Sequence, residues 1–418
     1  MPFHNKWIKI SLFNLLIVSL FGVTMRYKIA FALPFIEQKK FLNAHSHFAF
    51  AGWVTQILMF LLIWQLKHTS FQNVLKKYKP ILYANLITAY GMLISFPFEG
   101  YGFFSIFFST LSIFVSYWFA VVFWKDINRQ PQKKLGHNWF KAALVFNVFS
   151  SAGPFTLAYL MAKKMLAQKL MLLSVYFFLH FQYNGWFFFA CMGLFTLMME
   201  DIIGNKKLLQ LVFYCFLIAI IPAYFLSALW LPVPFIVYLI IVLAALLQLV
   251  ALFYLFKIII QNKIIFFKIN ATGKTLFALC FAALCIKLIL QAGSIIPSLS
   301  KVAFSFRPII IGYIHLVLLG VITIFLLAYI STHQLNSFSK KFKTGIYIFV
   351  SGIILNEVIL MCQGINDIGE IWYIPLSFFN QSLFVVAVIM FTGLAFINVS
   401  FYRNNSLNEN DCNHKLSV

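Results

Sequence analysis

The chain has 418 residues, of which 62% are hydrophobic and only 10% are charged, and its mean hydropathy is +0.91. Because soluble domains are only about 45–50% apolar, this composition excludes an ordinary soluble protein and predicts an integral membrane protein. The net charge of +22 does not indicate a nucleic-acid partner, since the Lys and Arg residues gather in short segments between apolar runs, a pattern that marks membrane orientation.

Twelve apolar runs follow one another along the chain, each near or above the roughly 20 residues that a helix needs to cross a bilayer. We therefore predict an all-α polytopic membrane protein of about twelve transmembrane helices. A polar cytoplasmic tail follows at 403–418. The predicted helices lie near 7–24, 43–66, 80–97, 103–124, 138–161, 170–199, 207–228, 233–257, 273–292, 308–333, 343–363 and 373–400.

The distribution of Lys and Arg predicts the orientation of these helices. With the N-terminus inside, the inner segments carry 21 of the 32 Lys and Arg residues and the outer segments carry 9. Such an excess favours both termini in the cytoplasm. The two remaining lysines, Lys141 and Lys287, lie within helices. Lys287 is near the outer end of the ninth helix, where we expect its ammonium group to extend to the lipid headgroups.

Four histidines lie within apolar runs, where an ionisable side chain is costly and commonly functional. They are His45 and His47 in the second helix, His180 in the sixth and His315 in the tenth. In the predicted orientation all four lie in the outer half of the bilayer. The other five histidines are in loops or at inner helix ends, where we expect them to be solvated: His4, His68, His137, His333 and His414.

The spacing of these residues predicts an internal repeat. His45, His180 and His315 are 135 residues apart, and a glycine follows His47, His180 and His315 after five residues. The glycines are Gly52, Gly185 and Gly320, and the first two precede Trp53 and Trp186. A recurrence once per four helices predicts three four-helix arcs, at about 1–137, 138–272 and 273–402. We expect the glycines to allow a neighbouring helix or a flat macrocycle to approach the backbone.

The paired histidines of the second helix predict two different sites. At about 100° per residue, His45 and His47 project roughly 200° apart, so a regular helix cannot present both to one metal. A haem iron takes an axial imidazole from one side, or from both sides when it is low-spin. We therefore predict that His45, His47, His180 and His315 bind haem iron or copper.

The stretch from His45 to Val54, HSHFAFAGWV, resembles the haem-ligating segment of the catalytic subunit of haem–copper oxidases, especially the cbb3-type and nitric-oxide-reductase branch. The HxH in the second helix is similarly placed in the nitric-oxide-response haem and copper protein family, NnrS. This resemblance implies twelve helices in three arcs and b-type haem. It also implies possible copper, a cytochrome c or quinol donor, oxygen or nitric oxide as ligand, and a bacterial inner membrane.

Three departures from the family pattern limit this expectation. The chain has no His-His pair, so a copper or non-haem iron site would lack two histidines, and Asn184 stands where nitric oxide reductases have a glutamate. We therefore expect no complete binuclear centre. The HxH also lies in the second helix and not in the tenth as in the oxidases, which implies either a permuted order of the arcs or an analogy only. If the arcs are permuted by one, His180 would be the low-spin partner of His47 and His315 would lie near the haem of His45. If they are not permuted, His315 would be the partner of the pair.

Other polar residues could support such a site. Glu357 and Asn356 in the eleventh helix could relay protons or anchor a polar network. Arg307, Lys39 and Lys40 lie on the outer side, where they could pair with haem propionates or anchor the chain at the interface.

Three function classes follow from these expectations. The first is a membrane haem protein, either an oxidoreductase subunit that transfers electrons or a protein that binds nitric oxide or oxygen. The second is a secondary transporter, because twelve helices with internal repeats are also a transporter architecture. The third is a structural or assembly subunit, which would not need regularly spaced histidines. The first class explains these histidines. Six cysteines without a CxxC pair indicate small core residues rather than a disulfide framework.

Overall fold

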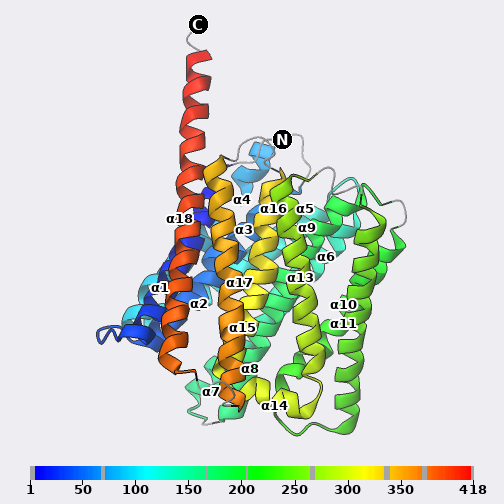
Figure 1. Ribbon diagram of the computed structural model, residues 1–418. Helices are drawn as coiled ribbons and strands as arrows, with labels where there is room; N and C mark the ends of the chain where they lie inside the picture. The colour runs from blue at the N-terminus through cyan, green and yellow to red at the C-terminus, as the bar shows by residue number, and fades with distance from the viewer. Residues whose placement is uncertain are drawn as a thin grey trace.

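The computed structural model describes residues 5–66, 71–165, 167–203, 206–263, 269–333, 339–369 and 374–415, and every regular element within them is helical (Figure 1). Eleven helices in this part of the chain are long and apolar enough to cross a bilayer. A further continuous helix from Gln168 to Glu200 carries the polar sequence Gln182-Tyr183-Asn184 near its centre. The prediction of an all-α polytopic membrane protein is therefore confirmed.

Nine membrane-length helices surround or border the histidine-bearing ones. They are α1 (Asn5–Phe31), α4 (Phe71–Glu99), α5 (Phe103–Asn128), α6 (Leu135–Ser150) continued by α7 (Ala152–Ala162), α10 (Lys207–Ala223) continued by η3 (Tyr224–Ala228), α11 (Phe235–Gln261), α13 (Ala271–Gly293), α17 (Lys340–Gly369) and α18 (Leu376–Lys415). A short helix, α14 (Pro297–Ser305), connects α13 to the tenth helix. The two ends of the chain lie at the same end of the bundle (Figure 1).

Three helices carry the four intramembrane histidines, and we call them the histidine helices. Each consists of an α-helix, a π-helical segment and a second α-helix. They are α2 (Gln38–Phe48), η1 (Ala49–Thr55) and α3 (Gln56–Trp64); α8 (Gln168–His180), η2 (Phe181–Phe187) and α9 (Phe188–Glu200); and α15 (Arg307–His315), η4 (Leu316–Thr323) and α16 (Ile324–His333). In each helix the π-segment begins one or two residues after a histidine.

Neighbouring side chains satisfy backbone carbonyls of two π-segments. The Asn14 Nδ2 donates to Gly52 O at 2.6 Å, the Asn85 Nδ2 donates to Ala51 O at 3.0 Å, and the Cys280 Sγ donates to Val321 O at 3.3 Å. A π-segment interrupts the regular i→i−4 ladder, and such segments are frequent at functional sites. These polar contacts therefore stabilise an irregularity that lies next to the histidines.

The glycines in the π-segments do allow close approach of a neighbouring helix at two of the three positions. A Cβ on Gly185 would lie 2.6 Å from the Cβ of Phe146 on α6, and one on Gly320 would lie 3.2 Å from the Cβ of Ala283 on α13. At Gly52 the space is filled by the ring of Phe48 from the same helix. Approach of a neighbouring helix is thus confirmed for Gly185 and Gly320.

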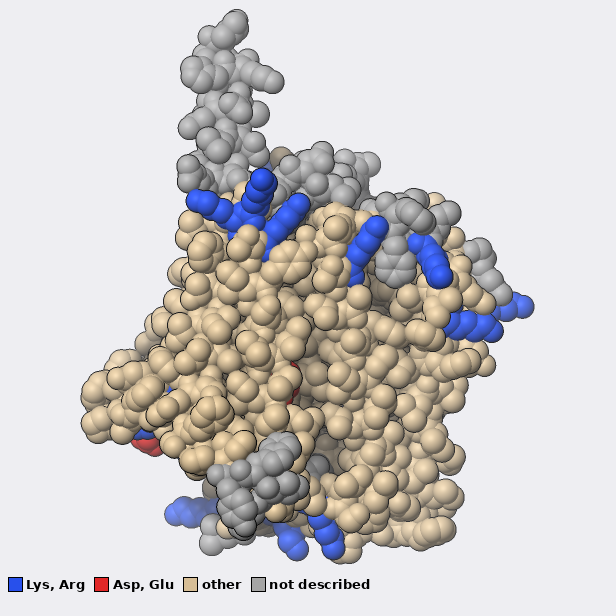
Figure 2. Space-filling view, viewed as in Figure 1, with Lys and Arg blue, Asp and Glu red and all other residues tan. Residues whose placement is uncertain are grey.

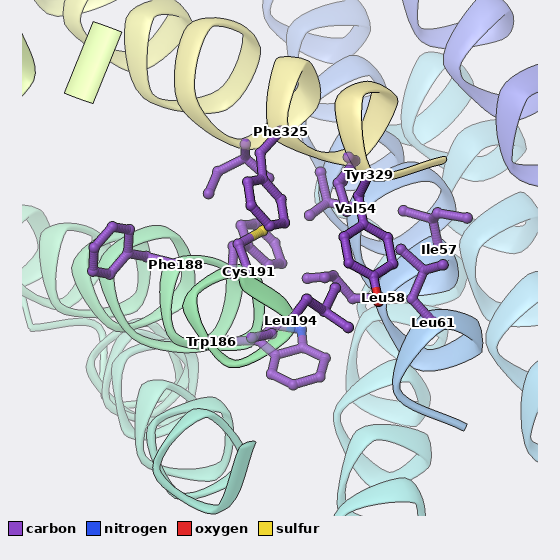
Figure 3. Packing of buried hydrophobic residues seen from close by; sticks show 14 of the residues in the cluster. Val54, Ile57, Leu58, Leu61, Trp186, Phe188, Cys191, Leu194, Phe325 and Tyr329 are labelled. Carbon is purple, nitrogen blue, oxygen red and sulfur yellow. The ribbon is translucent and has the colours of Figure 1, made fainter. Parts of the chain in front are cut away.

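The histidine helices pack tightly in one half of the bundle. We call the half next to the chain termini inner and the other half outer, following the predicted orientation. In the inner half, residues Gln56 to Ile63 of α3 and Ile324 to Ser331 of α16 are all buried. Figure 3 shows how side chains of α3, α9 and α16, among them Leu58, Leu194 and Tyr329, meet in one apolar core.

Two tryptophans connect the histidine helices at the level of the π-segments. The Trp53 Nε1 donates to Thr323 Oγ1 at 3.0 Å, which joins η1 to η4. The Trp186 Nε1 donates to Thr55 Oγ1 at 3.3 Å, which joins η2 to η1. Both indoles are almost fully buried, so a hydrogen-bond partner for each N–H is required. These bonds hold the three histidine helices in one register.

Candidate functional site

His45 lies on the outer part of the second helix and points toward α1. Its Nδ1 is 3.0 Å from the backbone oxygen of Val18. Because a carbonyl oxygen only accepts, Nδ1 carries the proton and donates, and Nε2 keeps its lone pair. This is the tautomer in which imidazole binds a metal through Nε2 while a backbone oxygen orients the ring. Gly22 lies beside the ring, since a Cβ there would be 3.6 Å from His45 Cε1.

His315 approaches the same region from α15. It lies close enough to His45 for an electrostatic interaction, and its Nδ1 is buried without a hydrogen-bond partner. A buried ring nitrogen without a partner is uncommon in native structures and calls for an explanation. The structure therefore brings His45 and His315 together from two different helices and leaves a ring nitrogen of His315 unsatisfied.

One arginine, Arg26, lies near this histidine pair, and a second, Arg307, lies near Arg26. Arg26, on α1, interacts electrostatically with His45 and His315, and also with Arg307 at the start of α15. Neither arginine takes part in an ion pair with any other described residue. Two guanidinium groups of like charge, near one another and without a carboxylate, form a suitable site for an anionic group.

Arg26 is the residue that sequence reasoning missed. It lies near the end of the first apolar run and was counted only among the outer charges that set the orientation. Its position one helical turn beyond Gly22 on α1 places it near the histidines. A search for a basic residue at an outer helix end, one turn from a glycine, would have found it.

The predicted propionate partners have different surroundings. Arg307 lies near Arg26, whereas Lys40 pairs with Glu37 at 2.9 Å and donates to Phe98 O. Lys39 is exposed on the surface of α2.

Glu357 and Asn356, the predicted relay residues, lie on α17. The Asn356 Nδ2 donates to the Glu357 Oε1 at 3.1 Å. The other carboxylate oxygen, Oε2, would be 3.8 Å from a Cβ on Gly312, which precedes His315 by one helical turn on α15. The carboxyl group therefore lies beside the helix that carries His315.

His47 serves the opposite flank of the second helix. Its ring stacks on Phe96 of α4 with centroids 4.5 Å apart, and its Nε2 is 3.5 Å from the hydroxyl of Tyr101. Burial raises the pKa of Tyr101, so its phenol stays protonated and can donate to the imidazole. His45 contacts α1 and His47 contacts α4, which confirms that the two side chains diverge.

His180 has both ring nitrogens engaged in this structure. Its Nε2 donates to Ile220 O at 2.8 Å, and its Nδ1 accepts from Asn184 Nδ2 at 3.2 Å. The receiving carbonyl lies just before Pro222, where α10 changes to the 3₁₀ segment η3. The hydrogen bonds of His180 thus connect the sixth helix to an irregular helix end, and the structure places it beside Lys287 and not beside His47.

Two of the histidines expected to be solvated line a recess instead. His137 is 9% exposed, and with His333, Gln65 and Tyr329 it lines a recess of about 480 Å³ at the inner ends of the histidine helices. The expectation of a solvated His137 is wrong because Lys134 and Leu135 begin a helix that packs against α9, and its first turn is buried. His4 and His68 lie outside the described residues.

Within the described part of the chain, no group of three or more His, Cys, Asp or Glu side chains lies close enough together to hold a metal ion. A haem iron would need only one or two ligands from the protein, because a porphyrin supplies four of its six. The Nε2 lone pair of His45 and the unpartnered nitrogen of His315 are ligand atoms of the required kind, and the arginines carry the charge that propionates would need.

No protein-family model matches this sequence, and no curated protein matches it significantly.

Proposed function

We propose that this protein is an integral membrane haem protein, in which His45 of α2 and His315 of α15 hold one b-type haem. The observation that carries the proposal is the convergence of these two imidazoles, one in a metal-binding tautomer and the other with an unpartnered nitrogen. A non-covalent b-type haem agrees with the absence of a CxxC pair in the sequence.

Arg26 and Arg307 would hold the propionates of this haem. Both guanidinium groups lie on the outer side of the histidine pair, and charge-assisted bonds to carboxylates are among the stronger hydrogen bonds in proteins. The propionate edge would then face the outer surface. When bound by two imidazoles, the iron supplies one-electron redox chemistry, and electron exchange with a carrier at the outer face, such as a cytochrome c, is the expected role.

Binding of nitric oxide or oxygen is the role that follows if only one of the two histidines holds the iron. An iron with one axial imidazole keeps an open position for a diatomic ligand. Glu357, whose carboxyl lies beside Gly312 on the helix that carries His315, would then exchange protons with the ligand. The two roles therefore differ in the coordination of one iron and can be separated by spectroscopy.

The test is an absorption and electron paramagnetic resonance spectrum of protein purified from cells supplied with haem. We expect a Soret band with one haem per chain and a low-spin ferric signal. His45→Ala and His315→Ala should each abolish the low-spin signal, because each removes an axial ligand. His333→Ala, a histidine at the inner end of the tenth helix, is the matched control and should leave the spectrum unchanged.

Two outcomes would overturn the proposal. Colourless, folded protein would exclude a haem and leave a secondary transporter or a structural subunit as the remaining classes. A Soret band that survives in the His45→Ala and His315→Ala double variant would place the haem elsewhere. A high-spin signal in the unaltered protein would keep the haem and assign the ligand-binding role.

A further inference from the structure

Lys287 does not extend to the lipid headgroups as its sequence position predicts. Its side chain on α13 is only 6% exposed, and its Nζ lies 5.9 Å from the centre of the Phe188 ring on α9. It also lies close enough to His180 for an electrostatic interaction. The expectation fails because the inward face of α13, which includes Leu284 and Lys287, packs against neighbouring helices, so the side chain points into the bundle.

This buried ammonium group lacks a counter-charge. Four ion pairs join described residues, and none of them includes Lys287. Removing an ion from water costs several kcal/mol even after relaxation, whereas a cation–π contact returns only about 0.5–2 kcal/mol. The contact with Phe188 therefore does not compensate the burial of a charged Lys287, so this side chain is buried either as a neutral amine or beside an anion.

Two buried amides lie near the level of this lysine, one on its own helix and one on the neighbouring helix α11. Gln291 is one helical turn beyond Lys287 on the same face of α13, and Gln248 belongs to the buried face of α11. Two contacts align these antiparallel segments: the Tyr238 hydroxyl donates to Ile295 O, and the Phe256 ring stacks on the Phe281 ring. Gln248 and Lys287 lie between these two contacts, each on its own helix. The bracketing contacts place Gln248 and Lys287 at nearly the same level.

Both amides have unsatisfied hydrogen-bonding capacity. Gln248 is 7% exposed and Gln291 is 6% exposed, and the Oε1 of each is buried without a hydrogen-bond partner. Rotating either amide by half a turn exchanges its oxygen and nitrogen with almost no change of shape. Each can therefore present an N–H donor in place of its unpartnered oxygen.

We propose that Lys287, Gln248 and Gln291 form a binding site for a small monovalent anion such as chloride. One ammonium group compensates one negative charge, and two amide groups donate further hydrogen bonds to it. The resulting neutral pair removes the need to bury an isolated cation in the membrane interior. This site is separate from the proposed haem site and does not depend on it.

The test is thermal unfolding of the purified protein in sodium gluconate that is replaced stepwise by sodium chloride at constant ionic strength. A ligand that binds only the folded state raises stability with the logarithm of its concentration above its Kd. We expect the unfolding temperature to rise with chloride in the unaltered protein and to become independent of chloride in Lys287→Met. The matched control is Lys141→Met, since Lys141 also lies in a membrane helix with its Nζ 5.6 Å from an aromatic ring, that of Trp124. This control should retain the full chloride response.

A second measurement applies if Lys287→Met does not fold. Equilibrium binding of radioactive chloride to the unaltered protein should give one ion per chain, and Gln291→Leu and Gln248→Leu should each weaken the binding about tenfold, as expected for one lost hydrogen bond to a charged group. No chloride binding to the unaltered protein, or an unchanged response in Lys287→Met, would overturn the proposal. Either result can be obtained whether or not the protein contains haem.

Discussion

The outer and inner halves of the histidine helices are built by the same three chain segments but are packed differently. In the outer half, α15 has no buried residue and α2 has only Ala44 and Phe48 buried. In the inner half, α3 and α16 are buried over almost their whole length. The π-segments and the two tryptophan bonds lie at the boundary between them.

The two halves also differ in the kind of side chain that they contain. The inner half contains large apolar side chains that contact one another across all three helices (Figure 3). The outer half contains His45, His315 and Arg26, whose polar groups require partners. Close packing makes the inner half rigid, and the accessible outer half is where a ligand can insert between helices. Figure 2 shows that the side of the bundle in view is almost free of charge between two bands of Lys and Arg.

The outer half faces away from the cytoplasm only if the predicted orientation holds. A reversed orientation would change the side of the membrane for every segment, which is the largest effect expected here. A reporter fused after residue 335 or at the C-terminus should read as cytoplasmic, and one inserted in 293–306 should read as external, because basic segments stay inside. The location is measured with two reporter enzymes, one active only in the cytoplasm and the other active only outside it. The reverse pattern would place the histidine pair on the cytoplasmic side and exclude an external electron carrier.

Loss of a large inner side chain should cost the most stability. Phe60→Ala removes a fully buried ring of α3, and we expect about 3 kcal/mol of destabilisation, at the low end for aromatic truncations because helices in lipid gain little from the transfer term. The matched outer change, Ile310→Ala, removes a half-buried side chain and should cost less than about 1 kcal/mol. Unfolding in denaturing detergent measures both, and equal losses would contradict the difference in packing.

Enlarging a side chain should destabilise the inner half and leave the outer half unaffected. In the inner half, a Cβ on Gly193 would lie 2.4 Å from the Phe140 ring, and Gly193→Ala should cost about 1–3 kcal/mol through overpacking. In the outer half, Gly312→Ala would meet nothing closer than 3.6 Å and should be neutral or slightly stabilising, because alanine favours helix. The same unfolding assay decides, and a destabilised Gly312→Ala would show that the outer half is closely packed.

Arg26 should affect the ligand and not the fold. Arg26→Gln removes one guanidinium from the histidine pair, and we expect roughly tenfold weaker haem binding, as for the loss of one hydrogen bond to a charged group. Haem transfer to apomyoglobin measures the change. Lys39→Gln, on the exposed surface of α2, is the control and should leave haem affinity as it is. Equal effects of the two changes would indicate a general influence of surface charge.

The smallest expected effect concerns the boundary between the halves. Thr323→Val removes the acceptor of the Trp53 indole but keeps the volume of the side chain, and it should cost about 1 kcal/mol. Thr332→Val, whose hydroxyl bonds only the carbonyl of Ala328 in its own helix, should be close to neutral. A double-mutant cycle with Trp53→Phe isolates the pair, and a coupling energy of zero would mean that this bond does not join η1 to η4.

Much of the fold could be predicted from the sequence because a bilayer imposes strict demands on a chain. Backbone polar groups must be satisfied within each segment, so every apolar run of sufficient length has to be a helix. The run at 103–124 corresponds to α5, Phe103–Asn128, and the run at 233–257 corresponds to α11, Phe235–Gln261. The divergence of His45 and His47 followed equally from helix geometry alone.

The site could be predicted only in part, because the sequence lists candidate residues without their partners. His180 and His315 have the same spacing from their neighbours in sequence, yet one bonds Ile220 and Asn184 and the other has an unpartnered nitrogen. Arg26 and Lys287 were assigned to the membrane surface from their positions near helix ends. Which of these residues meet depends on the rotation of each helix about its axis.

The sequence by itself determined the solvent of this protein, the number and length of its helices and the set of intramembrane polar residues, because hydropathy and helix geometry act locally along the chain. Only the tertiary structure decided that His45 and His315 lie within electrostatic reach of one another, that His180 bonds a backbone carbonyl and that Lys287 faces the interior. The physical reason is that helix packing in lipid is set by close contacts among small and polar side chains from segments far apart in the sequence, and these contacts have no periodicity that a single segment reveals.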